Sequence, residues 1–196
     1  MIRALALAAG AGTLLVGCAG SEQLPQAANA QAMREQDSAR AEQLAEALLL
    51  ADRAEHAGDA KALGKAAQLI DQLDPQAQTE SDAETLRRWR AALPASAPPP
   101  TRGRALGPGY RSAVLMPGAT TQLSQTFLGG HSARIVVKIA EGSALKLMVR
   151  DQSELEVCRA ERNPVNCRWV PLYTQRHNIK IANTGGAMAR FYIVFD

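Results

Sequence analysis

The residues that could carry out chemistry are few and lie far apart along the chain. Three histidines, His56, His131 and His177, occur in three different segments. Either of the last two could pair with Ser132 or Asp151 in a nucleophilic site, but a structural or solvated role is the favoured interpretation. The chain contains no G-x-S-x-G, H-E-x-x-H, P-loop or G-x-G-x-x-G motif. We therefore expect no catalytic residues, and an unrecognised hydrolase is the less favoured alternative.

Two further groups could in principle form an acid–base or metal site. Glu154 and Glu156 fall on one face of a predicted strand, where two carboxylates could act as general acid and base. Arginines lie nearby, so a solvated or charge-balancing role is favoured. Cys158 and Cys167 have no neighbouring histidine or further cysteine, which makes them a poor zinc site. We expect neither a metal nor a cofactor.

One basic constellation stands out among the polar residues. Arg134, Lys138, Lys146 and Arg150 all occur on the polar faces of two successive predicted strands. If those strands share a sheet, four cations project to one side. The favoured interpretation is a solvated face that protects the sheet from aggregation through its edges. The alternative is a site that attracts anionic envelope material, such as lipid head groups or phosphorylated glycan.

The N-terminus predicts an export signal. Arg3 is followed by apolar or small residues from position 4 to 16, which is shorter than the roughly 20 residues that span a hydrocarbon core. The segment ends in LVGC at residues 15–18, which resembles the lipobox of bacterial lipoproteins. The resemblance implies cleavage after residue 17 and acylation of Cys18, with palmitate or a similar chain. An ordinary secretory signal with an incidental Cys18 is the alternative.

A lipidated cysteine would fix the location of the protein. Two or more acyl chains hold a protein stably to a bilayer. In the lipoprotein family an Asp after the cysteine favours inner-membrane retention, and Ala19 stands there in this chain. We therefore expect a cell-envelope protein on the outer membrane that faces the periplasm. Export also excludes nucleic acid as a partner.

The two remaining cysteines predict a disulfide. Lipidation of Cys18 leaves Cys158 and Cys167 in an oxidising compartment, where disulfides persist. They bracket the eight residues RAERNPVN, in which Asn163 and Pro164 predict a turn. We expect these two cysteines to be bonded to each other.

The first half of the mature chain predicts helices. Residues 18–29 are small and polar and predict a flexible tether. Residues 30–93 predict about three short helices. The first ends at Gly58, the second covers residues 60–73 behind an Asp59 cap, and the third starts from a capping box at residues 81–84.

The first two helices weakly resemble a tetratricopeptide helix–turn–helix unit. The resemblance implies a groove that docks envelope proteins. The favoured alternative is that the apolar stripes of these helices pack on each other and on the rest of the chain.

The second half predicts strands. Residues 94–109 are rich in proline and predict a semi-rigid linker. The period of the apolar residues then changes from about 3.6 to 2. One such stretch has Ile135, Val137 and Ile139 on one face and Arg134, Val136 and Lys138 on the other. Seven or eight short strands without interleaved helices predict an antiparallel, jelly-roll-like β-sandwich over residues 110–196. The expected fold class is α+β in separate segments, with the helical segment first.

Several motifs of this half point to one family. They are the turn at residues 117–118, the Gly129-Gly130 pair, LKLMVRD followed by a cysteine, CRWVP, the turn at residues 183–185 and a closing aromatic strand. On these features the segment resembles the bacterial pre-peptidase C-terminal-like domain, a jelly-roll β-sandwich. The resemblance implies a module of secreted or anchored proteins that serves in binding or folding. Some members bind calcium through acidic residues, but Lys146 stands where relatives commonly carry Asp, which argues against a calcium site.

The charge is divided between the two halves. The whole chain has a net charge of +3, yet residues 18–93 carry 13 acidic and 8 basic residues, whereas residues 94–196 carry 6 acidic and 13 basic residues. Such asymmetry predicts two surfaces of different character. We expect a lipid-anchored envelope protein with a non-catalytic binding or structural role. The alternative is a carbohydrate- or anionic-ligand-binding module of an envelope enzyme assembly.

Overall fold

The computed structural model describes residues 24–93, 107–142, 144–161 and 164–196, with the side chains of the first helix described from residue 39. Three helices come first: α1 (Leu24–Ala57), α2 (Ala60–Leu73) and α3 (Glu80–Arg90), with the short strand β1 (Gln76–Ala77) before α3. Eight strands follow, namely β2 (Gly109–Leu115), β3 (Thr120–Phe127), β4 (Ala133–Glu141), β5 (Leu145–Arg150), β6 (Glu156–Ala160), β7 (Val165–Trp169), β8 (Gln175–Asn183) and β9 (Ala189–Phe195).

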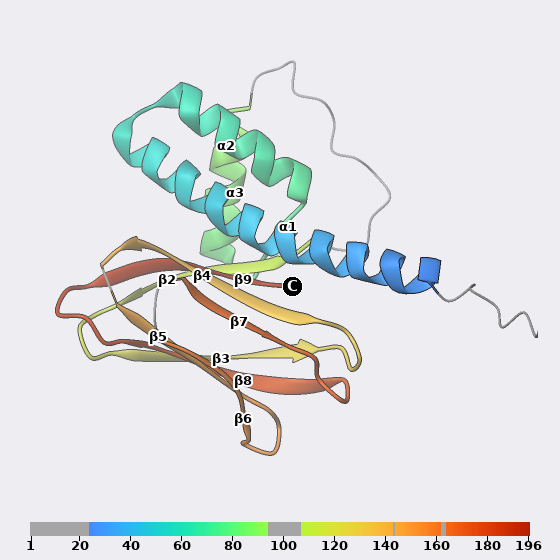
Figure 1. The fold of residues 1–196 in the computed structure, drawn as a ribbon. Helices are drawn as coiled ribbons and strands as arrows, with labels where there is room; N and C mark the ends of the chain where they lie inside the picture. Colours follow the sequence, from blue (N-terminus) through green and yellow to red (C-terminus); the bar gives the residue numbers. More distant parts are fainter. Residues whose placement is uncertain (1–23, 94–106, 143, 162–163) are drawn as a thin grey trace, which may run out of the picture.

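The strands form two sheets that pack face to face (Figure 1). The five-stranded sheet has the order β1-β2-β9-β4-β7, and the four-stranded sheet has the order β3-β8-β5-β6. All pairs are antiparallel except β1 with β2. The predicted α+β fold, with helices before an antiparallel sandwich, is therefore confirmed.

The alternation of apolar residues determines what lies between the sheets. Ile135 and Val137 of β4 point inward, where they meet Leu147 of β5 and Ile181 of β8. Each of these side chains is almost completely buried, and burial of one such side chain stabilises the fold by about 1.5–3 kcal/mol. The faces predicted for these strands from the period of 2 are the faces that the structure shows.

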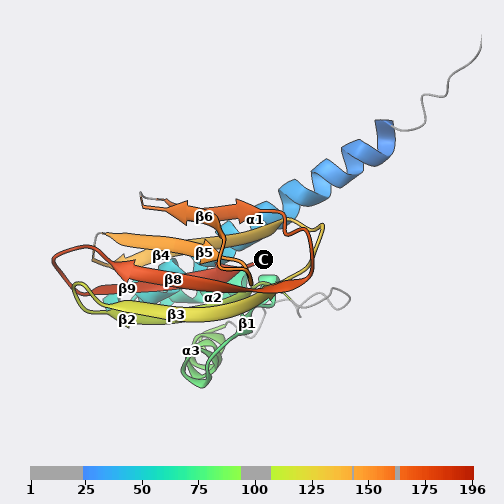
Figure 2. The ribbon, with the colours of Figure 1, turned by 90° about the horizontal axis from the view of Figure 1, so that it is seen from below.

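The helices cover the outer face of the five-stranded sheet and leave the four-stranded sheet uncovered (Figures 1 and 2). Val136, Tyr192 and Val194 point to this face and share one buried cluster with Leu44 and Trp89 of the helices. Strand β9 is thus buried on both faces, which explains why its sequence is apolar except at Arg190, and β4 carries the buried Val136 on its outer face. The helices and the sandwich are held together by a common hydrophobic core.

The helix ends follow local chemistry. Gly58 adopts a left-handed backbone (φ 67°) between α1 and α2, and the Asp59 side chain accepts a hydrogen bond from the backbone of Ala62 at 2.9 Å. The capping box predicted at residues 81–84 is wrong, because α3 starts earlier. Thr79 is the N-cap, and its hydroxyl accepts from the backbone N–H of Asp82 at 3.1 Å.

The predicted disulfide between Cys158 and Cys167 is confirmed, with their sulfur atoms 2.04 Å apart. Cys158 lies on β6, at the edge of the four-stranded sheet, and Cys167 lies on β7, at the edge of the five-stranded sheet. The bond therefore ties the two sheets together where no backbone ladder joins them.

The remaining boundaries are partly described. The signal segment and Cys18 lie outside the described residues, as do residues 94–106 of the predicted linker. Helix α1 begins at Leu24, inside the predicted tether. Gly107 packs closely, since a Cβ there would lie 2.1 Å from the backbone oxygen of Asp74. None of the described helices has the length and hydropathy needed to cross a membrane.

Candidate functional site

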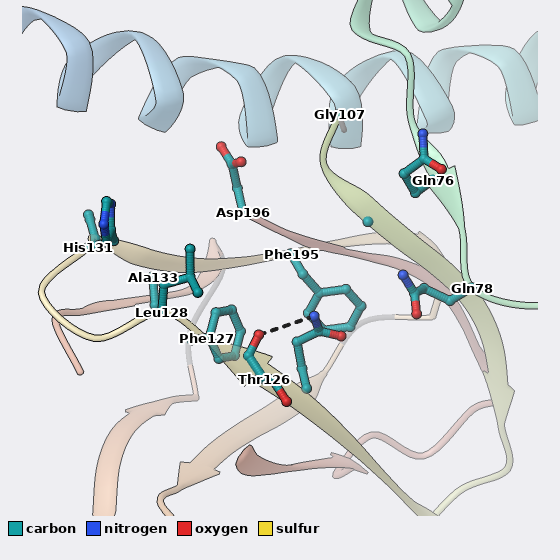
Figure 3. A pocket seen from close by; sticks show the side chains of 13 residues that line it. Gln76, Gln78, Gly107, Thr126, Phe127, Leu128, His131, Ala133, Phe195 and Asp196 are labelled. Atoms are coloured by element: carbon teal, nitrogen blue, oxygen red, sulfur yellow. Dashed lines mark hydrogen bonds between the residues drawn. The ribbon is translucent and has the colours of Figure 1, made fainter. Parts of the chain in front are cut away.

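A cavity of about 310 Å³ opens at one end of the sandwich, between the edge strand β1 and its neighbour β2 in one sheet and the edge strand β3 of the other. Figure 3 shows side-chain amides and aromatic rings facing this space. We call it the end pocket, and its polar and aromatic lining includes Gln76, Gln78, Gln125, Phe127, His131 and Phe195. Its size falls within the usual range for small-ligand sites.

The short strand β1 brings two glutamines to the pocket. The backbone N–H of Gln76 donates to Pro108 at 3.0 Å, and that of Gln78 donates to Tyr110 at 2.9 Å. Gly109 leaves room for the second amide, because a Cβ there would lie 2.8 Å from Nε2 of Gln78. The lack of a side chain at residue 109 therefore allows this amide to lie against β2.

Strand β3 supplies the opposite wall. Its alternation places Gln125 and Phe127 on the face toward the other sheet. The Gln125 amide donates to the backbone oxygen of Thr126 at 3.4 Å, as drawn in Figure 3. The Phe127 ring packs edge-to-face on Trp169, with ring centroids 4.8 Å apart, and this contact fixes the aromatic floor.

His177 has a structural role behind this floor. It is completely buried, and its Nε2 lies 3.2 Å from Nε1 of Trp169. An indole N–H can only donate, so Nε2 accepts and the proton is on Nδ1, which lies 3.2 Å from the backbone oxygen of Gln175. This arrangement agrees with the structural interpretation of His177 favoured from the sequence.

The other candidate catalytic residues have different partners. The Ser132 hydroxyl accepts a hydrogen bond from Nε of Arg168 at 3.2 Å. The Asp151 carboxylate accepts from the backbone N–H groups of Ser153 and Leu155, at 2.8 and 3.0 Å, and so caps its own turn. In the part of the chain that the structure describes, no three His, Cys, Asp or Glu residues are grouped as metal ligands.

The basic constellation predicted from the sequence is not assembled in the structure. The prediction required β4 and β5 to share a sheet, but the chain crosses between the two sheets at this point, so Arg134 and Lys138 lie in one sheet and Lys146 and Arg150 in the other. Arg134 and Lys138 face helix α1. There Arg134 pairs with Glu42 at 2.7 Å, and Lys138 pairs with Glu46 at 2.9 Å.

The other two cations lie on the outer face of the four-stranded sheet. Lys146 pairs with Glu161 at 2.6 Å, and Arg150 lies 3.5 Å from Glu154. The hydrogen bond from Lys146 holds the pKa of Glu161 below its ordinary value. The idea of one four-cation site is therefore wrong, because the cations are divided between two surfaces and each has a carboxylate partner.

Sequence reasoning missed a polar network between the helices and the sheet. Asp52 of α1 is only 4% exposed; it accepts a hydrogen bond from the Tyr192 hydroxyl at 3.0 Å and forms an ion pair with Arg190. Burial, together with the nearby charge of Asp52, raises the pKa of Tyr192 above its ordinary value of 10.0. The available signal was an acidic residue four positions after the buried Leu48, on the apolar face of a helix.

A second part of this network joins α1 to α3. Glu55 accepts hydrogen bonds from Arg88 at 2.6 Å and from the indole of Trp89 at 3.0 Å. The bond from Arg88 lowers the pKa of Glu55 against the opposing effect of burial. The carboxylates of Asp52 and Glu55 are both bonded to side chains of other elements. We therefore interpret the network as a structural tie between α1, α3 and the sheet.

No protein-family model and no curated protein matches the chain. Among solved structures, the pre-peptidase C-terminal domain of a collagenase from Bacillus anthracis is similar, with a TM-score of 0.40 and 10% identity over 44% of this chain and 87% of that one. The mitogen from Yersinia pseudotuberculosis gives a TM-score of 0.39 and 11% identity over 45% and 84%.

A third similar structure is PliG from Aeromonas hydrophila, a periplasmic inhibitor of g-type lysozyme. Its TM-score is 0.37, with 9% identity over 45% of this chain and 84% of that one. Similarities at this level carry no inference about ligand or activity. The β-sandwich itself rests on the strand order and the core described above.

Proposed function

We propose that the protein is a lipid-anchored component of the bacterial cell envelope, on the outer membrane, with a non-catalytic binding or accessory role. In this role the end pocket binds an uncharged polar ligand, of which a glycan is the best-fitting class. The lipobox at residues 15–18 supports the anchor. The resemblance of residues 110–196 to pre-peptidase C-terminal-like modules is consistent with a binding role.

The observation that carries the proposed ligand is the lining of the end pocket. Three amides, those of Gln76, Gln78 and Gln125, stand around an aromatic floor that includes Phe127 and Phe195. An amide both donates and accepts hydrogen bonds, which matches the hydroxyl groups of a sugar. An apolar face of the ligand would pack on the rings.

The alternatives have less support. An anionic ligand was the alternative interpretation of the four cations, and these are divided between two surfaces and paired with carboxylates. A hydrolase would need an activated nucleophile, whereas Ser132 accepts from Arg168 and Asp151 caps a turn. Docking of an envelope protein on the helices is a second candidate, since Leu50 of α1 and Leu69 of α2 remain exposed beside a hollow between the two helices.

The pocket is tested by binding measurements on the non-acylated chain from residue 19 onward. The chain is first applied to an array of bacterial envelope oligosaccharides and then titrated by calorimetry with the oligosaccharide that binds best. We expect Gln125→Ala to weaken binding about 2- to 10-fold, because one neutral hydrogen bond contributes roughly 0.5–1.5 kcal/mol.

The matched control is Gln122→Ala. Gln122 lies on the same strand but on the exposed outer face of the sandwich. This variant should bind as the unchanged protein does. The proposal fails if no oligosaccharide binds, or if the two variants weaken binding equally.

A further inference from the structure

Exposed apolar side chains gather at the end of the sandwich that carries the pocket. Leu128 lies in the β3–β4 loop and is 60% exposed, whereas Val170, Leu172 and Tyr173 lie in the β7–β8 loop and are 58%, 84% and 74% exposed. Single exposed apolar residues are ordinary, but a group of them commonly marks an interaction site. We call these four residues the loop-tip surface.

The two loops are bound to each other. The backbone N–H of Gly129 donates to the Thr174 hydroxyl at 3.0 Å, and that of Gly130 donates to the backbone oxygen of Pro171 at 2.8 Å. A Cβ at Gly129 would lie 2.7 Å from the backbone of Tyr173. The close approach needs glycine there, and it holds the four side chains on one surface.

The surroundings of the loop-tip surface carry positive charge. Residues 128–132 and 170–174 contain no Asp or Glu, and the carboxylate of Asp196 lies at the end pocket beside them. Arg168 and Arg176 stand on either side of the β7–β8 loop and are exposed. An apolar loop flanked by two exposed arginines complements the boundary between acyl chains and anionic head groups in a bilayer.

The direction of α1 relates this surface to the proposed anchor. Strand β4 begins at Ala133, which pairs with Trp169 at the end of β7, so the two loops extend from the same end of the sandwich. Helix α1 runs parallel to β4, because Glu42 pairs with Arg134 near the start of the strand and Glu46 pairs with Lys138 further along it. The amino end of α1 therefore projects past the end that carries the loops (Figure 1).

The amino end of α1 and the loop-tip surface thus lie toward the same end of the sandwich. Helix α1 begins at Leu24, six residues after Cys18, and six residues reach about 20 Å at most. We propose that the loop-tip surface rests on the lipid bilayer, with Leu172 and Tyr173 at the head-group boundary and Arg168 and Arg176 against lipid phosphates. This inference rests on the proposed membrane location.

A bilayer on the loop-tip surface would also orient the end pocket. Leu128 is part of the loop-tip surface and also lines the end pocket, as does His131 of the same loop. A ligand in the pocket would then lie beside the membrane surface, where glycans attached to envelope lipids are presented.

The test is flotation of the non-acylated chain, residues 19–196, with lipid vesicles. This chain contains every described residue, and without acyl groups it reports on the protein surface alone. We expect it to float with vesicles of phosphatidylethanolamine and phosphatidylglycerol, less well with phosphatidylcholine alone, and less well in high salt. Leu172→Ser with Tyr173→Ser should lower the vesicle-bound to free ratio about tenfold or more.

The control is Leu50→Ser with Leu69→Ser, which removes two exposed apolar side chains from the helices and should leave flotation unchanged. Thermal melting checks that both variants fold. The inference is overturned if the unchanged chain does not float, if the loop variant floats equally well, or if the loop variant instead loses a co-purifying envelope protein. Because acylation of Cys18 is measured separately by mass spectrometry, failure of the loop contact and failure of the anchor give different results.

Discussion

Asp52 connects three parts of the molecule through one carboxylate. It stands on α1, accepts from Tyr192 and pairs with Arg190, both of which belong to β9. Arg190 in turn donates to Glu141 of β4 at 2.6 Å. Removal of a buried charge leaves its partner without compensation, and that desolvated partner is the main source of the lost stability.

We predict that Asp52→Asn lowers the free energy of unfolding by about 2–3 kcal/mol, because a hydrogen-bonded charge is lost beside a cation that is mostly buried. Urea unfolding followed by tryptophan fluorescence measures this, since Trp89 packs against Tyr192 in the same junction. The control Glu42→Gln breaks an ion pair whose carboxylate side chain is 51% exposed and should cost less than about 1 kcal/mol. Equal losses in the two variants would mean that the network is not a structural tie.

Residue-scale prediction from the sequence succeeded where the information was local. The disulfide between Cys158 and Cys167 followed from the pairing of two cysteines across a short turn. The role of Asp52 could not be foreseen, because its partner Arg190 is 138 residues away. The end pocket was missed for the same reason, as Gln76 and Gln125 meet only through the pairing of β1 with β2 and the packing of the sheets.

The positions of the strands and helices were predicted closely from the sequence. Which strands lie next to each other in a sheet was not. The period of 2 gave the inward and outward faces of β4 and β5 correctly. It contains no information on whether consecutive strands pair or cross to the opposite sheet. Arg134 and Lys146 were therefore placed together although they belong to different sheets. The apolar residue Val136 on the polar face of β4 was the available sign that helices cover that face.

The disulfide joins the β6 edge of the four-stranded sheet to the β7 edge of the five-stranded sheet. We predict that the double variant Cys158→Ser and Cys167→Ser loses roughly 2–3 kcal/mol of unfolding free energy, the amount expected for closing a loop of this length. Urea unfolding of the variant and of the reduced protein measures it. Reductant should lower the stability of the unchanged protein to that of the variant and leave the variant unaffected. A reduced protein as stable as the oxidised one would contradict this role.

At the scale of the whole molecule, helices and sandwich form one packed body. Tyr110, Tyr192 and Val194 of the sheet are buried under Leu48 and Trp89 of the helices, so the helical segment completes the core. The sequence left two options for the apolar stripes of the helices, docking of a partner or packing on the sandwich. The structure shows packing for most of the stripe and leaves Leu50 and Leu69 exposed.

The proposed functional features are all at one end of the molecule. The amino end of α1 lies toward one end of the sandwich (Figure 1), and the end pocket and the loops of the loop-tip surface lie at that same end. An acyl anchor at that end would bring the pocket and the exposed loops to the membrane together. The proposed membrane location of the binding role and of the bilayer contact therefore depends on lipidation of Cys18.

Mass spectrometry of the protein purified from bacterial membranes tests that dependence most directly. We predict that the mature chain begins at Cys18, and that this residue carries a thioether-linked diacylglyceryl group and an acylated amine. Replacement of Cys18 by Ser should abolish the modification and leave only the weaker, salt-sensitive membrane association of the loop-tip surface. A chain that retains Met1, or that carries an unmodified thiol at residue 18, would contradict the proposed location.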